Sequence, residues 1–313
     1  MRANYYSIFF FSMFASVCAQ LYGLSNTVQL QRYAADGTSV NIGPARPSDL
    51  QAQNLAALDA LNGIYYFVGY DAATPTLVGL SISTGAVVSS VSLPFAEMAF
   101  IGVGQSLAWA SDLGLAVLTG QTADKTHIVG TVNVTSGKWT QKAKISNTDY
   151  DVLGASCAYI PGGTFIFNLG VTNGTVIANF AVDLATGKVR TADTNDKSNI
   201  ESMSYNVLDK MIYGLGLHIV GGGWTRSIVR LDPTTLAITE LGLVTDYGIE
   251  SGGIGTVDAA AHSLWWIGMK APYVPNTPLF LVQSSLVDGS TISSAQLCDN
   301  DAVCPWSLEF RAT

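Results

Sequence analysis

The chain has 313 residues, of which 48% are hydrophobic and 12% are charged, so it can bury a substantial core and falls outside the disordered class. Its formal net charge of −8 is spread thinly and its Lys and Arg residues never cluster, which argues against a nucleic-acid-binding surface. Length, composition and charge therefore predict an acidic globular protein.

The N-terminal segment, residues 1–19, differs from the rest of the chain. Arg2 supplies a positive charge, residues 8–17 form an apolar run, and small residues precede Gln20. This pattern is typical of a secretory signal peptide. A membrane anchor is the rival interpretation, but a run of about ten apolar residues is well short of the ~20 that a spanning helix needs. We expect residues 20–313 to form a single secreted, extracellular domain with no membrane span, and a monomer.

A glycine-containing phrase recurs through residues 20–313. Equivalent positions, spaced by 48 to 54 residues, are held by Gly37, Gly85, Gly137, Gly187, the segment DPTTLAI around Thr235, and Gly289. Alternating apolar residues flank each phrase, as in half-buried strands, and a glycine accepts the positive φ of a tight turn. Each phrase therefore predicts the tip of a β-hairpin.

A further pair of strands precedes these tips from the second repeat onward. Its first strand is built from small residues and its second is bulky, as in YYF at 65–67 and WW at 265–266. Small side chains suit a strand close to a crowded axis, and bulky ones fill the wider gaps further out. Six repeats of four antiparallel strands predict an all-β fold, a six-bladed β-propeller. A helical solenoid is excluded because a 3.6-residue apolar period is missing.

The two ends of the chain complement each other. The N-terminal repeat supplies only three strands, in LYGLS, VQLQRYA and SVNIGPA, whereas WSLEFRA at the C-terminus is one spare strand. We expect this C-terminal strand to complete the first blade, which closes the ring and removes exposed strand edges.

The cysteines suggest an oxidising compartment. Cys298 and Cys304 lie six positions apart in the loop before the C-terminal strand and are expected to form a disulfide. A zinc site would need two further ligands, and the three histidines are isolated. Cys157 lies in the apolar run GASCAYI and is expected to be a buried free thiol. Asn133 in NVT and Asn173 in NGT match the N-glycosylation pattern.

The repeat unit combines a small inner strand, an Asp-containing turn, a bulky second strand and a turn reading TG.V. It resembles the six-bladed propeller superfamily that includes the SMP-30/gluconolactonase and strictosidine-synthase-like proteins and the YWTD and NHL repeats. The resemblance covers all six repeats and matches no single family closely. It implies the architecture much better than it implies an activity.

Acidic residues occur at a regular interval in the loops that lead into the inner strands. They are spaced by 48 to 54 residues: Asp49, Glu97, Asp151, Glu201, Glu250 and Asp301. Six carboxylates around one channel mouth would raise one another's pKa and favour a bound cation, and hard oxygen ligands suit Ca²⁺ or another divalent ion. Acidic residues are also common in the exposed loops of any acidic protein, so a solvated acidic rim is the interpretation that we prefer to a cation site.

The resemblance to the SMP-30-like enzymes implies a more specific metal site. Its ligands would be Glu201 or Glu250 together with Asn206 and Asp258. The turn aspartates also have a structural interpretation, because Asp caps tight turns by accepting bonds from backbone N–H groups that follow it. That interpretation covers Asp59, Asp112, Asp209 and Asp258.

Common catalytic motifs are missing: the sequence contains neither a G-x-S-x-G elbow nor an H-E-x-x-H motif. We therefore expect an extracellular binding module for a protein or a glycan. The alternative is a divalent-metal-dependent, lactonase-like hydrolase with its site at the channel mouth, so whether the protein is an enzyme stays open at this point.

Overall fold

The computed structural model describes residues 20–25, 28–45, 51–71, 74–93, 107–122, 126–145, 150–151, 156–171, 177–194, 199–220, 223–248, 255–270, 278–299 and 307–311. These residues form strands and turns, and none of them belongs to a helix long and apolar enough to cross a bilayer. The expected signal peptide, residues 1–19, lies outside the described part.

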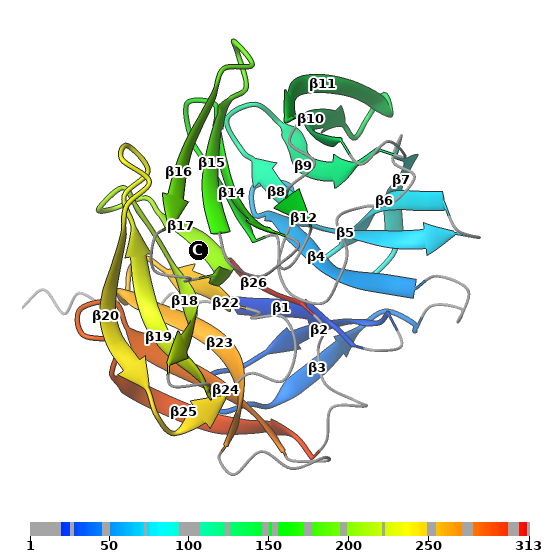
Figure 1. Ribbon diagram of the computed structural model, residues 1–313. Coiled ribbons are helices and arrows are strands. Elements are labelled where there is room, and N and C mark those ends of the chain that lie inside the picture. The colour runs from blue at the N-terminus through cyan, green and yellow to red at the C-terminus, as the bar shows by residue number, and fades with distance from the viewer. Residues whose placement is uncertain are drawn as a thin grey trace, which may run out of the picture.

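Within the described ranges the strands form six antiparallel sheets arranged radially, each with an innermost, a second, a third and an outer strand (Figure 1). The innermost strands are β26 (Ser307–Arg311), β4 (Gln51–Asp59), β8 (Leu107–Ala110), β13 (Cys157–Ile160), β17 (Asn199–Asn206) and β22 (Gly255–Asp258). The second strands are β1 (Gln20–Leu24), β5 (Ile64–Asp71), β9 (Leu115–Gln121), β14 (Thr164–Val171), β18 (Met211–Val220) and β23 (Ser263–Lys270).

The outer half of each sheet is the hairpin that carries the recurring phrase. The third strands are β2 (Leu30–Tyr33), β6 (Thr74–Ser81), β10 (His127–Asn133), β15 (Ile177–Asp183), β19 (Gly223–Leu231) and β24 (Leu279–Ser285). The outer strands are β3 (Ser39–Ile42), β7 (Val87–Ser92), β11 (Lys138–Ile145), β16 (Val189–Thr194), β20 (Ile238–Val244) and β25 (Thr291–Cys298). Two short strands, β12 (Tyr150–Asp151) and β21 (Tyr247–Gly248), add to β14 and β23. The prediction of a six-bladed β-propeller is confirmed.

The ring is closed by the two ends of the chain. β26 pairs antiparallel with β1, with Glu309 opposite Tyr22 and Arg311 opposite Gln20. Figure 1 shows this C-terminal strand beside the N-terminal strand at the centre of the ring. The first blade is therefore built from both ends, as the three-strand N-terminal repeat predicts.

The hydrophobic core is divided into layers that lie between neighbouring blades. One layer joins the third and fourth blades through Val117, Phe165, Phe167 and Phe180, and Phe167 stacks on Phe180 with ring centroids 5.3 Å apart. Equivalent clusters occupy the other five boundaries. Bulky residues of the second strands thus fill the wedge between sheets, which explains the small-then-bulky sequence pattern.

Two features of the recurring phrase favour glycine over other residues: a positive φ and a close contact with the neighbouring blade. Gly37 and Gly187 have φ of +82° and +73°, a region that favours residues without a Cβ. A Cβ on Gly187 would also lie 2.4 Å from the carbonyl oxygen of Lys142 on the outer strand of the preceding blade. On Gly37 it would lie 2.3 Å from the carbonyl of Gln296. Each of these two tips therefore rests directly on the neighbouring blade.

The fifth blade departs from this pattern. Its phrase contains no glycine, and the left-handed position is taken by Leu236, with φ of +61°, rather than by Thr235. The turn is otherwise the same, because the N–H of Leu236 donates to the carbonyl of Asp232 at 2.7 Å, as Gly187 donates to Asp183 at 2.7 Å. The leucine side chain is buried between the fourth and fifth blades. Burial of this side chain therefore offsets the strain of its backbone.

Candidate functional site

The predicted acidic ring lies mostly outside the described residues. Asp49, Glu97, Glu250 and Asp301 are not described, and of Asp151 only the backbone in β12 is described. Six carboxylates around one mouth therefore stay a prediction.

Glu201, the one member of that ring with a described side chain, is part of an ion pair. It is the extra residue of a β-bulge in β17, between Ile200 and Ser202, and a bulge re-aims a side chain. Nε of Arg226, on β19, donates to Oε2 of the carboxylate at 3.2 Å. Burial raises the pKa of Glu201, while the Arg226 charge acts to lower it. The sequence did not point to Arg226, because the two residues lie on strands of the same blade that are separated by a third.

The proposed metal ligands are only partly brought together. Asn206 and Asp258 end the neighbouring inner strands β17 and β22, so they lie at the same end of the channel. Glu201 lies five residues before Asn206, which is about 16 Å of strand at about 3.3 Å per residue. Glu250 is outside the described residues. In the part of the chain that the structure describes, no three His, Cys, Asp or Glu side chains gather as a metal site would require. The metal site stays a prediction.

The turn interpretation is confirmed for three of the four turn aspartates. Oδ1 of Asp59 accepts from the N–H of Asn62 at 3.1 Å, Oδ1 of Asp209 from Met211 at 3.1 Å, and Oδ1 of Asp258 from Ala261 at 2.9 Å. Asp112 does something different: it accepts from the fourth blade, from the hydroxyl of Tyr159 at 2.6 Å and the N–H of Gly162 at 2.7 Å. Repeat alignment alone gave no sign of this inter-blade contact.

The channel holds a cavity of about 290 Å³ that is lined by residues from all six innermost strands. Strand register places one residue of each inner strand at the same level around it: Ala57, Ala108, Ala158, Ser204, Thr256 and Glu309. Five of these residues are small. At this level of the cavity wall, five blades therefore contribute alanine, serine or threonine. The first blade, which closes the ring, contributes a glutamate.

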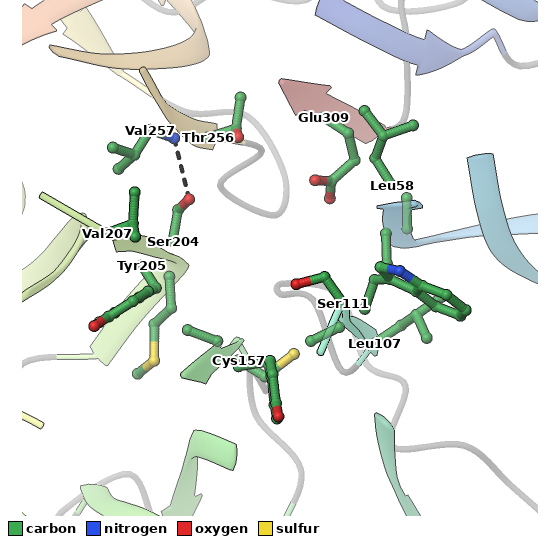
Figure 2. A pocket seen from close by; sticks show the side chains of 18 of the residues that line it. Leu58, Leu107, Ser111, Cys157, Ser204, Tyr205, Val207, Thr256, Val257 and Glu309 are labelled. Carbon is green, nitrogen blue, oxygen red and sulfur yellow. Dashed lines mark hydrogen bonds between the residues drawn. The ribbon is translucent and has the colours of Figure 1, made fainter. Parts of the chain in front are cut away.

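Glu309 is the one acidic residue among the described residues that line the cavity. Figure 2 shows its carboxylate directed into the open space that Ser111, Ser204 and Thr256 also border. Burial raises the pKa of Glu309 to about 8. Burial also raises the pKa of Cys157 across the cavity, and the Glu309 charge adds to that shift. Cys157 is a buried free thiol, as predicted.

Sequence reasoning did not select Glu309, although a signal for it exists. In the segment WSLEFRA, Glu309 occupies a polar position in an alternating polar and apolar pattern, which is common in β-strands. Only alignment of the C-terminal strand with the other inner strands would have shown that Glu309 stands where Ala57, Ala108 and Ala158 stand.

The cavity extends to one face of the ring. Its lining includes Ser111, Pro161, Val207 and Ala259, which belong to the turns that join the innermost to the second strand in the third to sixth blades. We call these turns, with residues 60–63 of the second blade, the inner turns. In antiparallel blades they all lie on the face opposite the loops that lead into the inner strands. The cavity is therefore continuous with the inner-turn face.

Large apolar side chains are exposed on this face. Leu61 is 85% exposed, Leu113 45%, Val207 60% and Leu208 69%. They come from the inner turns of the second, third and fifth blades, which surround the channel. We call these four residues the apolar turn rim. The second and third blades are neighbours and the fifth lies across the channel from the second, so these residues are distributed around the channel opening, and exposed apolar residues there are a candidate interaction surface.

The predicted modification sites are partly described. Asn133 is exposed in the turn after β10, where its Oδ1 accepts from the N–H groups of Thr135 at 3.1 Å and Ser136 at 2.9 Å. Asn173 is outside the described residues. Cys298 ends β25 and Cys304 is outside the described residues, so the disulfide stays a prediction.

The fold and its central cavity define a six-bladed β-propeller with four-stranded blades. No family model matches the sequence, and no curated protein matches it. Solved structures do match. A chain from a nidogen/laminin complex superimposes with a TM-score of 0.64 at 9% identity, over 94% of this chain and 98% of that one.

Two further structures extend the comparison. TolB from Acinetobacter baumannii has a TM-score of 0.62 at 14% identity, over 94% of this chain and 67% of that one. A luciferin-regenerating enzyme has a TM-score of 0.51 at 13% identity, over 79% of this chain and 76% of that one. At these identities the likeness concerns the fold alone. The resemblance to the six-bladed propeller superfamily is confirmed at that level.

Proposed function

We propose that this protein is a secreted, extracellular binding module that holds a protein partner on its inner-turn face. The observation that carries the proposal is the apolar turn rim, formed by Leu61, Leu113, Val207 and Leu208 around the channel. These side chains are 45% to 85% exposed, so a large part of their apolar surface is not buried in the core of their own blades. Their burial against a partner would stabilise a complex by about 25 cal/mol per Å² of apolar surface covered.

Charge on the same face indicates the chemistry of the partner. Asp112 and Asp209 are exposed on the inner turns, beside Leu113 and Leu208. Lys210 is exposed on the same turn as Asp209, so these turns carry two carboxylates and one ammonium group, an excess of one negative charge. An apolar rim with this excess is complementary to a segment that carries both apolar and basic side chains. The partner we propose is a protein with such a segment, in preference to a glycan.

The fold and the N-terminal segment support the same function. A ring of blades closed by β26 presents its turns on a stable frame, and the similar chain from the nidogen/laminin complex belongs to a complex between proteins. Residues 1–19 have the pattern of a signal peptide. Secretion would also provide the oxidising compartment for a disulfide between Cys298 and Cys304.

Selection from a random peptide library displayed on phage tests the binding proposal. The immobilised wild-type protein should enrich peptides that combine Leu, Ile, Phe or Trp with Lys or Arg. The double variant Leu61→Ser, Leu208→Ser should lose these peptides, with affinity reduced at least tenfold, because both side chains are exposed and their removal leaves the core intact.

A matched control separates the rim from general surface hydrophobicity. Val40 and Leu243 are 56% and 58% exposed on outer strands, so Val40→Ser, Leu243→Ser removes similar apolar surface elsewhere. This control should bind the selected peptides like wild type. Failure to enrich any peptide, or equal loss in both double variants, would overturn the proposed binding face.

The secretion part has its own test. Expressed with its full N-terminus in eukaryotic cells, the protein should appear in the medium with Gln20 as its first residue, and a non-reducing peptide map should join Cys298 to Cys304. Retention in the cells with Met1 intact contradicts secretion.

A further inference from the structure

We propose that Asn133 carries an N-linked glycan and that this glycan limits the area of the inner-turn face that a protein partner can cover. The first part concerns a covalent modification that the binding function does not require. The second part rests on the proposed function, because it concerns the same face.

Asn133 ends β10 and caps the hairpin tip of the third blade. Its Oδ1 accepts from the N–H groups of Thr135 at 3.1 Å and Ser136 at 2.9 Å. At the equivalent position of the next two blades, Oδ1 of Asp183 and Oδ1 of Asp232 accept from the N–H groups two and three residues further on, at 2.7 to 3.3 Å. The cap therefore needs only an acceptor oxygen, which an aspartate supplies as well as an asparagine.

The side-chain amide nitrogen of Asn133 has no role in this turn. Among the residues that the structure describes, Nδ2 has no hydrogen-bond acceptor, and both Asn133 and Thr135 are exposed. Residues 133–135 form one of the two N-x-[ST] patterns in the sequence. An exposed turn is the structural context that this pattern requires of a glycosylation site. Asparagine thus adds to the cap a nitrogen atom to which a sugar can be joined.

The modification is a group transfer from an oligosaccharide carried on a polyprenyl diphosphate. A bond forms between Nδ2 of Asn133 and the anomeric carbon of the first sugar, and the bond between that carbon and the diphosphate oxygen breaks. The amide gives up one of its two protons, and the polyprenyl diphosphate leaves. Oδ1 takes no part, so the bonds that it accepts from Thr135 and Ser136 are compatible with the attached glycan.

The hairpin tips lie on the same face of the ring as the inner turns. In the fourth blade the N–H of Leu184, at the tip, donates to the carbonyl of Gly163, in the inner turn, at 2.8 Å. In the sixth blade Leu286 donates to His262 in the same way at 3.1 Å. In the third blade β8 and β10 run in the same direction, because both pair antiparallel with β9. Asn133 therefore lies on the inner-turn face.

Within the third blade, Asn133 lies further from the channel than the apolar turn rim does. The register across β9 places Asn133 level with Ala110, the last residue of β8. These two backbone positions are about 10 Å apart, because each strand adds about 4.8 Å. Leu113 of the rim belongs to the turn that follows Ala110. A glycan on Asn133 therefore stands beside the rim and restricts a partner to the centre of the face and the other blades.

Mass analysis of the secreted protein tests the modification. The full chain is placed behind an independent secretion signal and expressed in eukaryotic cells, so the result does not depend on residues 1–19. All variants carry Asn173→Gln, which removes the other N-x-[ST] pattern. This parent should carry one glycan, which peptide N-glycosidase F removes. Peptide mapping should then find aspartate at position 133.

Three substitutions at the turn provide matched controls. Asn133→Asp keeps the capping oxygen and Thr135→Ala keeps the donating N–H, so both should be secreted and unfold like the parent, but both should lose the glycan. Thr135→Ser keeps the pattern and should keep the glycan. A parent secreted without a glycan, or a glycan that persists in Asn133→Asp, would show that Asn133 is not the site.

A lectin tests where the glycan lies relative to the binding face. An inhibitor of glycan processing keeps the glycan rich in mannose, and concanavalin A is added before the peptides selected on the inner-turn face. The lectin should block the peptides on the parent and have no effect on Asn133→Asp. The control moves the glycan to the other end of β9 and β10, where the N–H of Thr122 donates to the carbonyl of Thr126 at 2.9 Å. For this purpose Asp124→Asn, added to Asn133→Asp, creates the pattern N-K-T that ends at Thr126.

The lectin should bind this relocated glycan and leave the peptides bound. Blocking in both glycosylated proteins, or in neither, would show that the Asn133 glycan does not border the binding face. If no peptide can be selected, the second part falls with the proposed function, whereas the mass analysis still decides whether Asn133 is glycosylated.

Discussion

The hydroxyl of Tyr159 in the fourth blade donates to Oδ1 of Asp112 in the third, at 2.6 Å, and so joins two neighbouring sheets at the inner-turn face. The N–H of Gly162 completes the contact on Oδ2 at 2.7 Å. Burial and this hydrogen bond raise the pKa of Tyr159. The Asp112 carboxylate therefore binds both the innermost strand of the fourth blade, through Tyr159, and the inner turn of that blade, through Gly162.

Removal of either partner should destabilise the ring modestly. We expect Tyr159→Phe to lower the free energy of unfolding by about 1 kcal/mol and Asp112→Ala by about 2 kcal/mol, because a hydrogen bond to a charged group contributes about 1.5–3 kcal/mol when shielded and less when exposed. Urea unfolding of both single variants and the double variant measures the coupling. Strict additivity would show that the two groups do not interact in solution.

The left-handed Leu236 predicts an unusual order of two substitutions. Leu236→Ala removes buried side-chain surface and keeps the strain of φ +61°. Leu236→Gly removes the same surface but relieves the strain, which costs an L-residue about 1–2 kcal/mol. The Gly variant should therefore be more stable than the Ala variant by about 1 kcal/mol in urea unfolding.

The control for this prediction is Leu231, which is fully buried at the end of β19. At an ordinary strand position glycine is less stable than alanine by about 0.5–1 kcal/mol. Leu231→Gly should therefore be less stable than Leu231→Ala. The same order at both leucines would contradict the strain attributed to Leu236.

Glu309 predicts a pH-dependent difference in stability. Its pKa is about 8 in the folded protein and 4.5 in its ordinary state, so between these values the folded protein holds a proton that the unfolded chain has lost. The unfolded state binds fewer protons, and stability therefore falls as pH rises, by at most about 1.4 kcal/mol per unit. Partial exposure of the side chain to the cavity limits the pKa shift, and with it the width of the pH window over which stability falls.

A neutral residue removes this effect. Relative to wild type, Glu309→Gln should gain stability as pH rises from 4.5 to 8 and should be close to wild type at pH 4. Denaturant titrations at pH 4, 6 and 8 measure the difference in free energy of unfolding between the two proteins. The contributions of all other titratable groups cancel in this difference because both proteins contain them. A constant difference across the three values would show that Glu309 does not titrate within this window.

The fold was predictable from the sequence because it depends on local rules that repeat. Gly37 and Gly187 mark the hairpin tips through their positive φ, and the contrast between small and bulky strands follows from distance to the axis. The N-terminal repeat supplies three strands where the others supply four, and this difference was enough to predict β26 as the closing strand.

The site was less predictable because it depends on contacts between repeats. The sequence predicts Glu201 as a member of the acidic ring and as a candidate metal ligand, but it does not indicate the bulge and the Arg226 ion pair that set its environment. Glu309 becomes notable only when β26 is placed in the ring of inner strands. Asp112 matched the turn-capping pattern of its equivalents, yet its partner is the next blade.

The closing strand gives the strongest prediction about the whole ring. A chain that ends at residue 306 lacks β26, so β1 keeps β2 but loses its antiparallel partner on the channel side, and the cavity wall loses one of its six inner strands. An unpaired edge at the centre exposes backbone groups and apolar surface, which favours association between chains. We expect this truncated protein to elute as aggregates in size-exclusion chromatography and to lose cooperative thermal unfolding.

A chain that ends at residue 311 keeps β26 and should remain monomeric and unfold cooperatively. Monomeric, cooperative behaviour of the shorter chain would mean that pairing of β26 with β1 is not what holds the ring closed.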